Sequence, residues 1–248
     1  MSLLGVAGLE ARYGLLHAVR DVSFDVVDGE RLALVGANGA GKTTLLRVIA
    51  GAHGAAAGSV RFGGQDVTTV PAHRRVRRGI ALVPEGRRLF PDLTVEENLL
   101  VAGARARPGP WTLHTVLDAF PILESLRGQR ASTLSGGEQQ ATAIARALMT
   151  NPRLLLLDEV SLGLSPVAVD GVYASLQALS REATTVVLVE QDLGRAIRFS
   201  DRLLCMLEGR VVLEGRADAI TREEVTQAYF GIGASPVGPD AAGNRESR

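Results

Sequence analysis

The sequence predicts an α/β protein with a parallel-sheet core, an N-terminal antiparallel β subdomain and an inserted α-helical subdomain. Four short apolar runs, each flanked by Gly, Asp or Glu, predict strands at 31–36, 79–86, 153–159 and 184–191. These runs are apolar throughout instead of alternating, which is typical of parallel strands covered on both faces. Helical stretches between them, at 42–51 and 136–150, indicate right-handed crossover connections.

Two turn signals predict antiparallel elements beside this core. Asp28-Gly29 lies between two apolar runs, which is a hairpin signal leading into the strand at 31–36. A small N-terminal antiparallel sheet is therefore expected. A second hairpin is expected within 201–215, with its turn at Glu208-Gly209.

Thr94 and Glu97 have the spacing of a capping box, which opens a helix. From there to about residue 150 the pattern is mostly helical, so we assign a helical subdomain to about 88–150, inserted between two core strands. One domain then covers 1–233. The small polar residues, Pro and Gly of 234–248 predict a disordered tail.

The composition narrows the function classes. Basic and acidic residues balance at 27 each, so no net charge attracts nucleic acid or an anionic membrane. No apolar run reaches the roughly 18–20 residues of a bilayer span, and the N-terminus has no secretory leader pattern. The single Cys205 is expected in the core, and the four His residues lack metal-ligand spacing. We expect a soluble cytoplasmic protein.

The stretch "GANGAGKT" fits the pattern G-x-x-x-x-G-K-[ST], after an apolar strand and at the start of a helix. Its glycines let the backbone curl so that N–H groups and the helix N-terminus face phosphate oxygens. The sequence thus predicts a P-loop NTPase core that binds a nucleoside triphosphate. The residues expected to bind it are Gly36, Ala37, Asn38, Gly39, Ala40, Gly41, Lys42, Thr43 and Thr44.

Lys42 is the only lysine of the chain, since all other basic residues are arginine. A compact ammonium fits between the β- and γ-phosphates, whereas the broad planar guanidinium of arginine is too large for the inside of such a loop. Thr43 is expected to ligate Mg²⁺. We interpret the survival of one lysine as evidence for this role.

The stretch "RLLLLDE" predicts a buried strand that ends in two carboxylates. Asp158 is expected to hold Mg²⁺ through water, and Glu159 to orient and polarise the attacking water. An apolar strand ending in Asp-Glu is common by itself, but about 110 residues after the phosphate-binding loop it is a strong signal.

In the stretch "LSGGEQQ", Ser135 and Glu138 form a capping box, and Gly136 and Gly137 expose backbone N–H groups in the first helical turn. A capped helix alone does not explain two destabilising glycines. Over roughly residues 3–233 the sequence resembles an ABC-transporter ATPase subunit, which implies that the bound nucleotide is ATP. The resemblance implies that these four residues grip the γ-phosphate held by a second ATPase subunit.

Three further positions correspond to functional residues of this family, but one has a second interpretation and two carry a different residue. Tyr13 matches the aromatic residue that stacks on adenine, although a core tyrosine is the other interpretation. Glu85 stands where the family's γ-phosphate-sensing loop has Gln, and it could ligate Mg²⁺. Gln191 stands where the family has a switch histidine; it can donate a hydrogen bond to the γ-phosphate but cannot titrate. In "DE", the proline that usually follows is replaced by Val160.

The combination of "GANGAGKTT", "PEGRR-F", "SLGLSP" and "VEQ" looks like the second ATPase subunit of branched-chain amino-acid importers. That resemblance implies a heterodimer with a related ATPase that binds two integral-membrane permeases. An extracytoplasmic solute-binding protein would act with it indirectly, and the subunit would lie on the inner face of the membrane. Urea and amide importers have similar subunits. A soluble ABC ATPase outside transport is the alternative from another class.

Two features leave their own alternatives. "HRRVRR" at 73–78 is expected to be the solvated face of a short helix that ends at Gly79, and binding of phospholipid or nucleic acid is the alternative. Phe90 is expected beside the groove for a permease helix, with a core position as the alternative.

Overall fold

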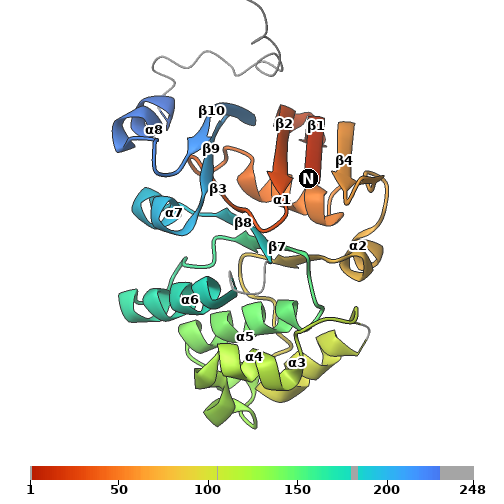
Figure 1. Cartoon of the computed structure of the whole chain (residues 1–248), viewed down its shortest axis with the longest axis vertical. Helices are drawn as coiled ribbons and strands as arrows, with labels where there is room; N and C mark the ends of the chain where they lie inside the picture. The colour runs from red at the N-terminus through yellow and green to blue at the C-terminus, as the bar shows by residue number, and fades with distance from the viewer. Residues whose placement is uncertain (1, 105, 180–183, 230–248) are drawn as a thin grey trace, which may run out of the picture.

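Six strands form the central sheet of the protein, whose computed structural model describes residues 2–104, 106–179 and 184–229. The strand order is β10-β9-β3-β8-β7-β6, and neighbours are parallel except β9 and β10. The bounds are Arg31–Val35 (β3), Ile80–Val83 (β6), Leu154–Asp158 (β7), Thr185–Val189 (β8), Arg202–Leu207 (β9) and Arg210–Arg216 (β10). The predicted parallel core is confirmed (Figure 1).

A second sheet of order β2-β1-β4-β5 lies beside the first, as predicted. Its strands are Ser2–Tyr13 (β1), Leu16–Val27 (β2), Ala57–Phe62 (β4) and Gln65–Asp66 (β5). All of its pairings are antiparallel.

The hairpin predicted at Asp28-Gly29 is wrong. The strand before this turn, β2, pairs with β1, whereas the strand after it, β3, joins the central sheet. The turn therefore leads from one sheet to the other, and the Gly29 N–H donates to the Thr185 hydroxyl at 2.8 Å. The hairpin predicted at Glu208-Gly209 is confirmed, with Leu207 opposite Arg210.

Helices connect the strands. Their bounds are Lys42–Ala50 (α1), Ala72–Arg78 (α2), Val95–Gly103 (α3), Leu113–Ala119 (α4), Gly136–Leu148 (α5), Pro166–Leu179 (α6), Leu193–Phe199 (α7) and Arg222–Tyr229 (α8), with 3₁₀ turns at Pro121–Leu126 and Ala131–Thr133. The capping box of α3 is formed: Thr94 N–H donates to Glu97 at 2.8 Å and Glu97 N–H to Thr94 at 3.2 Å. Helices α3, α4 and α5 all lie between β6 and β7 in sequence, so the helical insertion is confirmed; the tail predicted for 234–248 lies outside the described residues.

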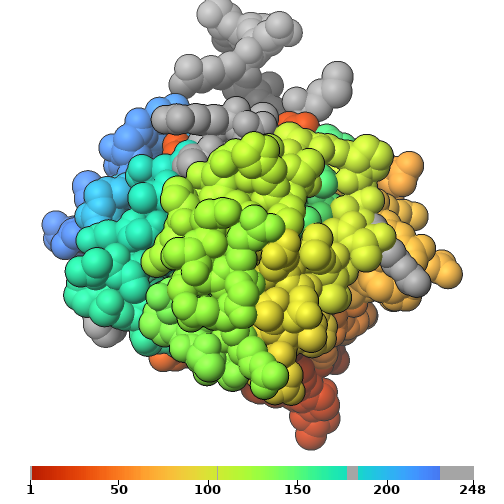
Figure 2. Space-filling view, turned by 90° about the horizontal axis from the view of Figure 1, so that it is seen from below, coloured from red at the N-terminus to blue at the C-terminus, as the bar shows by residue number. Residues whose placement is uncertain are grey.

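Strand β7 lies between two hydrophobic clusters, which explains why it is apolar up to Asp158. In β7, Leu154 and Leu156 face a cluster that contains α1 and the antiparallel sheet. Leu155 and Leu157 face the opposite cluster, which contains the helices inserted between β6 and β7. These inserted helices form the face of the molecule seen in Figure 2.

Helix α2 ends at Gly79 as predicted, but its arginines are not all solvated. Arg75 is 1% exposed. Its guanidinium donates to the carbonyl oxygens of Val48 (2.7 Å) and Ile49 (2.8 Å), at the C-terminal end of α1, and to two carbonyls of the loop before α2. A cation on the last carbonyls of a helix satisfies groups that the helix itself leaves unpaired. Arg75 is thus a structural residue, and the solvated-face interpretation is wrong for it.

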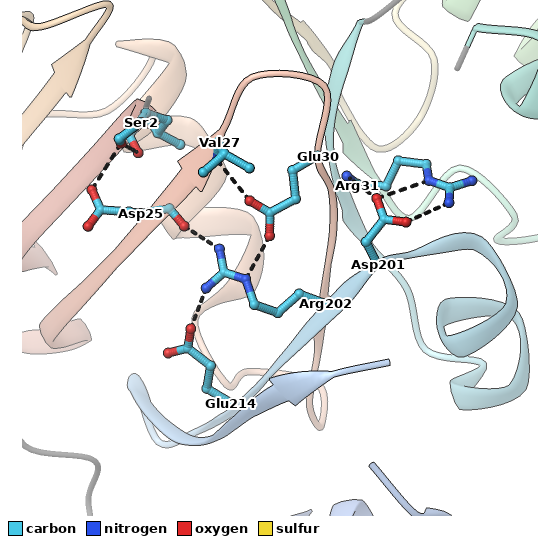
Figure 3. Close-up of polar contacts among 9 residues, drawn as sticks. Ser2, Asp25, Val27, Glu30, Arg31, Asp201, Arg202 and Glu214 are labelled. Carbon is cyan, nitrogen blue, oxygen red and sulfur yellow. Dashed lines mark hydrogen bonds and ion pairs between the residues drawn. The ribbon is translucent and has the colours of Figure 1, made fainter. Parts of the chain in front are cut away.

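A second arginine joins the two sheets (Figure 3). Arg202 of β9 donates to Glu30 at 2.6 Å, to Glu214 of β10 and to the carbonyl oxygen of Asp25 in β2. Beside it, Arg31 and Asp201 form an ion pair at 2.6 Å. The planar guanidinium suits this arrangement because it offers several donors in fixed directions.

Candidate functional site

Residues 36–41 join β3 to α1 in a loop that excludes side chains at two positions. Gly36 and Gly41 have φ of 148° and 100°. A Cβ on Gly41 would lie 2.2 Å from the carbonyl oxygen of Ala18, and one on Gly36 would lie 2.3 Å from that of Met206. The underside of the loop is therefore packed against the backbone, and Ala40 is buried. The residues open to a ligand are Ala37, Asn38 and Gly39.

Lys42 points back into this loop. It is 4% exposed, and its Nζ donates to the carbonyl oxygens of Gly36 at 2.6 Å and Ala37 at 3.0 Å. Burial lowers the pKa of Lys42, while the carboxylates of Glu159 and Asp158 act in the opposite direction. The ammonium thus lies inside the curl of the loop, among carboxylates and carbonyls that favour its charge.

Thr43 and Asp158 form a pair of oxygen donors at the start of α1. The Thr43 hydroxyl donates to Asp158 Oδ1 at 2.9 Å, and Thr44 is buried in the same turn. Asp158 is 1% exposed, and its Oδ2 has no hydrogen-bond partner among the described residues. Burial raises the pKa of Asp158, although the Thr43 hydrogen bond lowers it. A hard cation such as Mg²⁺ prefers oxygen ligands, so this orphaned oxygen fits one.

Glu85 lies in the loop after β6 and is exposed. Its charge contributes slightly to the raised pKa of Asp158, so the two carboxylates lie close enough for their charges to interact. In the described ranges, however, no three His, Cys, Asp or Glu side chains gather as a metal cluster. A Mg²⁺ here would draw its other ligands from phosphate oxygens and water, as is usual for this ion.

Glu159 and Gln191 meet where β7 and β8 end. These parallel strands place Asp158 opposite Val189, and the Glu159 N–H donates to the Val189 carbonyl at 3.1 Å. Glu159 has φ of +50°, in the left-handed region that non-glycine residues rarely occupy. The Gln191 side-chain amide donates to Glu159 Oε2 at 2.7 Å. The structure thus couples the predicted base to the predicted sensor directly.

The start of α5 carries the predicted capping box. The Ser135 N–H donates to Glu138 at 2.7 Å, and the Glu138 N–H donates to the Ser135 hydroxyl at 3.4 Å. A Cβ on Gly137 would lie 2.7 Å from the Cβ of Ala168 in α6. Close packing of α5 on α6 is therefore a second reason for glycine here, which the sequence pattern did not reveal. Gly136 is less constrained, with its nearest neighbours at 3.3 Å.

Comparisons with known proteins agree with this geometry. A family model described as "ABC transporter" matches residues 19–161. The branched-chain amino acid transport ATP-binding protein BraG of Pseudomonas aeruginosa is 45% identical over 222 residues, which cover 88% of this chain and 95% of BraG. The probable branched-chain amino acid transport ATP-binding protein LivF of Archaeoglobus fulgidus is 36% identical, over 90% of this chain and 95% of LivF.

The chain belongs to the ABC transporter family. It is an ATP-binding subunit with the ATPase activity of that family. Among solved structures, a nucleotide-free ATP-binding cassette from an ABC transporter superposes with a TM-score of 0.80 at 28% identity, over 92% of this chain and 99% of that one. A dimeric cassette, MJ0796 bound to ADP and Pi, gives a TM-score of 0.77 at 25% identity, over 88% of this chain and 100% of that one.

Other contacts of this ABC subunit were not evident from the sequence. Arg87, with φ of 63°, donates from its side chain to Gln139 of α5 at 2.9 Å. Its carbonyl accepts from Arg146, near the other end of the same helix, at 3.2 Å. The loop that carries Glu85 is thus attached at two points to α5, which we call the signature helix because it begins with the "LSGGEQQ" stretch. Phe90 follows this loop and is 49% exposed, so its core interpretation is wrong.

Tyr13 and Tyr229 lie on either side of the phosphate-binding loop in sequence. Tyr13 is 44% exposed, so a core position is wrong for it too, and its ring stacks on His53 with centroids 4.4 Å apart. Tyr229 of α8 accepts a hydrogen bond from the Gly36 N–H at 2.9 Å. Only the folded chain reveals this last contact, because about 190 residues separate its partners. Within the described ranges, no helix has the length and apolar character of a membrane span.

Proposed function

We propose that this ABC subunit powers an importer of branched-chain amino acids. The observation that supports ATP hydrolysis here is the convergence of Lys42, Asp158, Glu159 and Gln191 where β3, β7 and β8 end. Each makes a hydrogen bond of 2.6–3.0 Å, to the loop at 36–41, to Thr43, or, for the last two, to each other. The solute class follows from the similarity to BraG and LivF, which run almost full length against this chain.

Each predicted residue has a role in this proposal. The loop N–H groups and Lys42 bind the phosphates, and Tyr13 stacks on the adenine. Thr43 and Asp158 hold Mg²⁺, with Glu85 near enough to act through water; the ion neutralises charge on the phosphates. Glu159 takes the proton of the attacking water, and Gln191 fixes the orientation of Glu159. The residues offered to a nucleotide on the partner are Ser135, Gly136, Gly137 and Glu138.

The partners follow from the same proposal. The signature helix needs a second ATPase subunit, and we propose a related but different chain, so that the pair is a heterodimer. Two integral-membrane permeases would dock where Phe90 is exposed beside α5, and an extracytoplasmic solute-binding protein would act through them. The subunit would then lie on the inner face of the membrane, and no nucleic acid is involved. An importer of urea or amides, or an ABC ATPase outside transport, are the alternatives.

The test uses the membrane complex purified through a tag on this chain and reconstituted with its solute-binding protein. Glu159→Gln should lower ATP turnover at least about 100-fold, the usual contribution of a general base, while ATP affinity stays within about twofold. The matched control, Glu124→Gln, changes an exposed carboxylate of the helical insertion and should leave turnover unchanged. Leucine, isoleucine or valine should stimulate the wild-type complex. Stimulation by urea or short amides alone would refute branched-chain amino acids as the solute, and purification without any permease would refute the transport proposal.

A further inference from the structure

Glu190 is a buried carboxylate to which the roles above assign nothing. It directly follows β8 and is 2% exposed. The Ser161 hydroxyl lies 2.9 Å from both of its oxygens, and the Tyr173 hydroxyl donates to Oε2 at 2.5 Å. The N–H groups of Gln191 and Asp192 donate to Oε1 at 3.0 and 3.1 Å. In the described part of the chain it forms no ion pair.

The four donors belong to segments that surround the reacting groups. Ser161 lies two residues after Glu159, and Gln191 is the residue whose side chain holds Glu159. Tyr173 comes from α6, and its ring meets Phe199 of α7 edge to face at 5.7 Å. Glu190 therefore connects the loop after β7, the loop after β8 and a helix that packs against the signature helix.

A carboxylate is suited to this place because all four groups donate. An ionised carboxylate accepts at both oxygens and offers no donor that would oppose them. Burial raises the pKa of Tyr173, and the charge of Glu190 raises it further, so the tyrosine remains a neutral donor. Charge-assisted hydrogen bonds are about twice as strong as neutral ones, which offsets the cost of burying the charge without a cation.

We propose that Glu190 is a positioning residue for ATP hydrolysis, which holds the Glu159–Gln191 pair in its reactive geometry; this inference rests on the proposed function. Gln191 itself is exposed, so few contacts restrict its side chain. Its direction is set by its backbone, and Glu190 fixes that backbone at the N–H groups of 191 and 192. On the other side, Ser161 fixes the chain just after Glu159. Both ends of the 2.7 Å hydrogen bond are thus held by one carboxylate.

A purely structural role is the competing explanation, and it makes a different prediction. The N-cap of α7 is already Asp192, whose side chain accepts from the Arg195 N–H at 2.9 Å. If Glu190 only stabilised the fold, its loss would lower the melting temperature but leave kcat per folded molecule unchanged. If it positions the pair, kcat falls while ATP binding changes little, because the adenine contact and most phosphate contacts are proposed at Tyr13 and at residues 36–44.

The experiment compares Glu190→Ala and Glu190→Gln in the reconstituted complex, measuring kcat, KM for ATP and melting temperature. We expect the alanine variant to lose about tenfold or more in kcat with KM within about threefold. The glutamine variant should keep an intermediate rate, since its amide oxygen can still accept the two N–H groups. The control Thr185→Val removes buried hydrogen bonds at the other end of β8, and kcat should not change.

A double-mutant cycle makes the mechanism testable. In a Gln191→Ala background, Glu190→Gln should cost less in kcat than it costs in the wild type, because both changes act on the same pair. Fully multiplicative effects, or unchanged kcat in both Glu190 variants, would refute the positioning role. If the alanine variant does not fold, the glutamine variant in this cycle still decides the question. A wild-type complex without ATP hydrolysis would instead refute the proposed function.

Discussion

Replacing Asp158 with asparagine should make the nucleotide-free protein more stable and its Mg²⁺ response weaker. The carboxylate is 1% exposed, and only Oδ1 has a hydrogen-bond partner, the Thr43 hydroxyl at 2.9 Å. The amide oxygen of asparagine can keep that bond, while the buried negative charge, whose desolvation outweighs its attraction to nearby cations, disappears. What is lost is the oxygen that would bind the metal or its water.

The magnitude follows from this geometry. An unsatisfied buried polar group costs about 1–3 kcal/mol, and more when it is charged. The asparagine NH₂ in the place of Oδ2 is also unsatisfied, so only part of this cost is recovered, about 1 kcal/mol. For a chain of this size such a gain raises the melting temperature by about 2–4 °C.

The pH dependence gives a second check. Burial raises the folded-state pKa of Asp158 above its unfolded value, so the ionised side chain destabilises the fold at neutral pH. As the pH falls through the raised pKa, the wild type gains a proton and this cost disappears. The difference in melting temperature between variant and wild type should therefore shrink in acid.

Thermal unfolding is measured in EDTA, in ATP with EDTA, and in ATP with Mg²⁺. The first condition gives the stability of the nucleotide-free protein, and the last two together give the effect of Mg²⁺. The melting temperature of the wild type should rise when Mg²⁺ replaces EDTA in the presence of ATP, and that of Asp158→Asn should rise little. As a control, Asp201→Asn should not raise the melting temperature, because that half-exposed carboxylate is paired with Arg31. A variant no more stable than the wild type in EDTA would refute the claim that burial of the Asp158 charge costs stability.

The remaining predictions concern the two buried cations. Lys42→Arg should keep the fold but weaken ATP binding at least about tenfold, because a guanidinium does not fit within the loop; equal affinity in a titration would contradict this. Arg75→Met should lower the free energy of unfolding in urea by about 3 kcal/mol, since four carbonyls lose a charged donor. The exposed Arg77→Met on the same helix should be nearly neutral, and similar losses in both would show that burial of Arg75 is unimportant.

Much of the fold could be predicted because its signals are local. Strands that are apolar at every position require cover on both faces, and β7 receives it from two separate clusters. The residues of a turn say less about which strands pair with each other. Asp28-Gly29 and Glu208-Gly209 are similar turns, yet only the second joins paired strands. Whether a turn joins paired strands depends on which sheet the next strand enters. That in turn depends on contacts with residues more than a hundred positions away in the sequence.

In the site, too, the residues with local sequence signals could be predicted and those that depend on distant contacts could not. The phosphate-binding loop, Asp158 and Glu159 were placed from the sequence because each motif determines its own backbone. Arg75, Tyr229 and Glu190 were missed, since nothing in their neighbouring residues distinguishes a buried hydrogen-bonding role from an ordinary surface or helix position. The pattern "HRRVRR" contains four arginines, and only packing against the end of α1 separates one from the rest.

The hydrogen bond from Gly36 to Tyr229 has a consequence for synthesis on the ribosome. The phosphate-binding loop leaves the ribosome early, but the hydroxyl that accepts its first N–H is made about 190 residues later. At typical translation rates this delay is about 10–40 s. Both strands that flank β3, which are β8 and β9, also arrive late. A nascent chain therefore carries its nucleotide motif long before it has a finished loop, and a chain released early lacks the contacts that complete it.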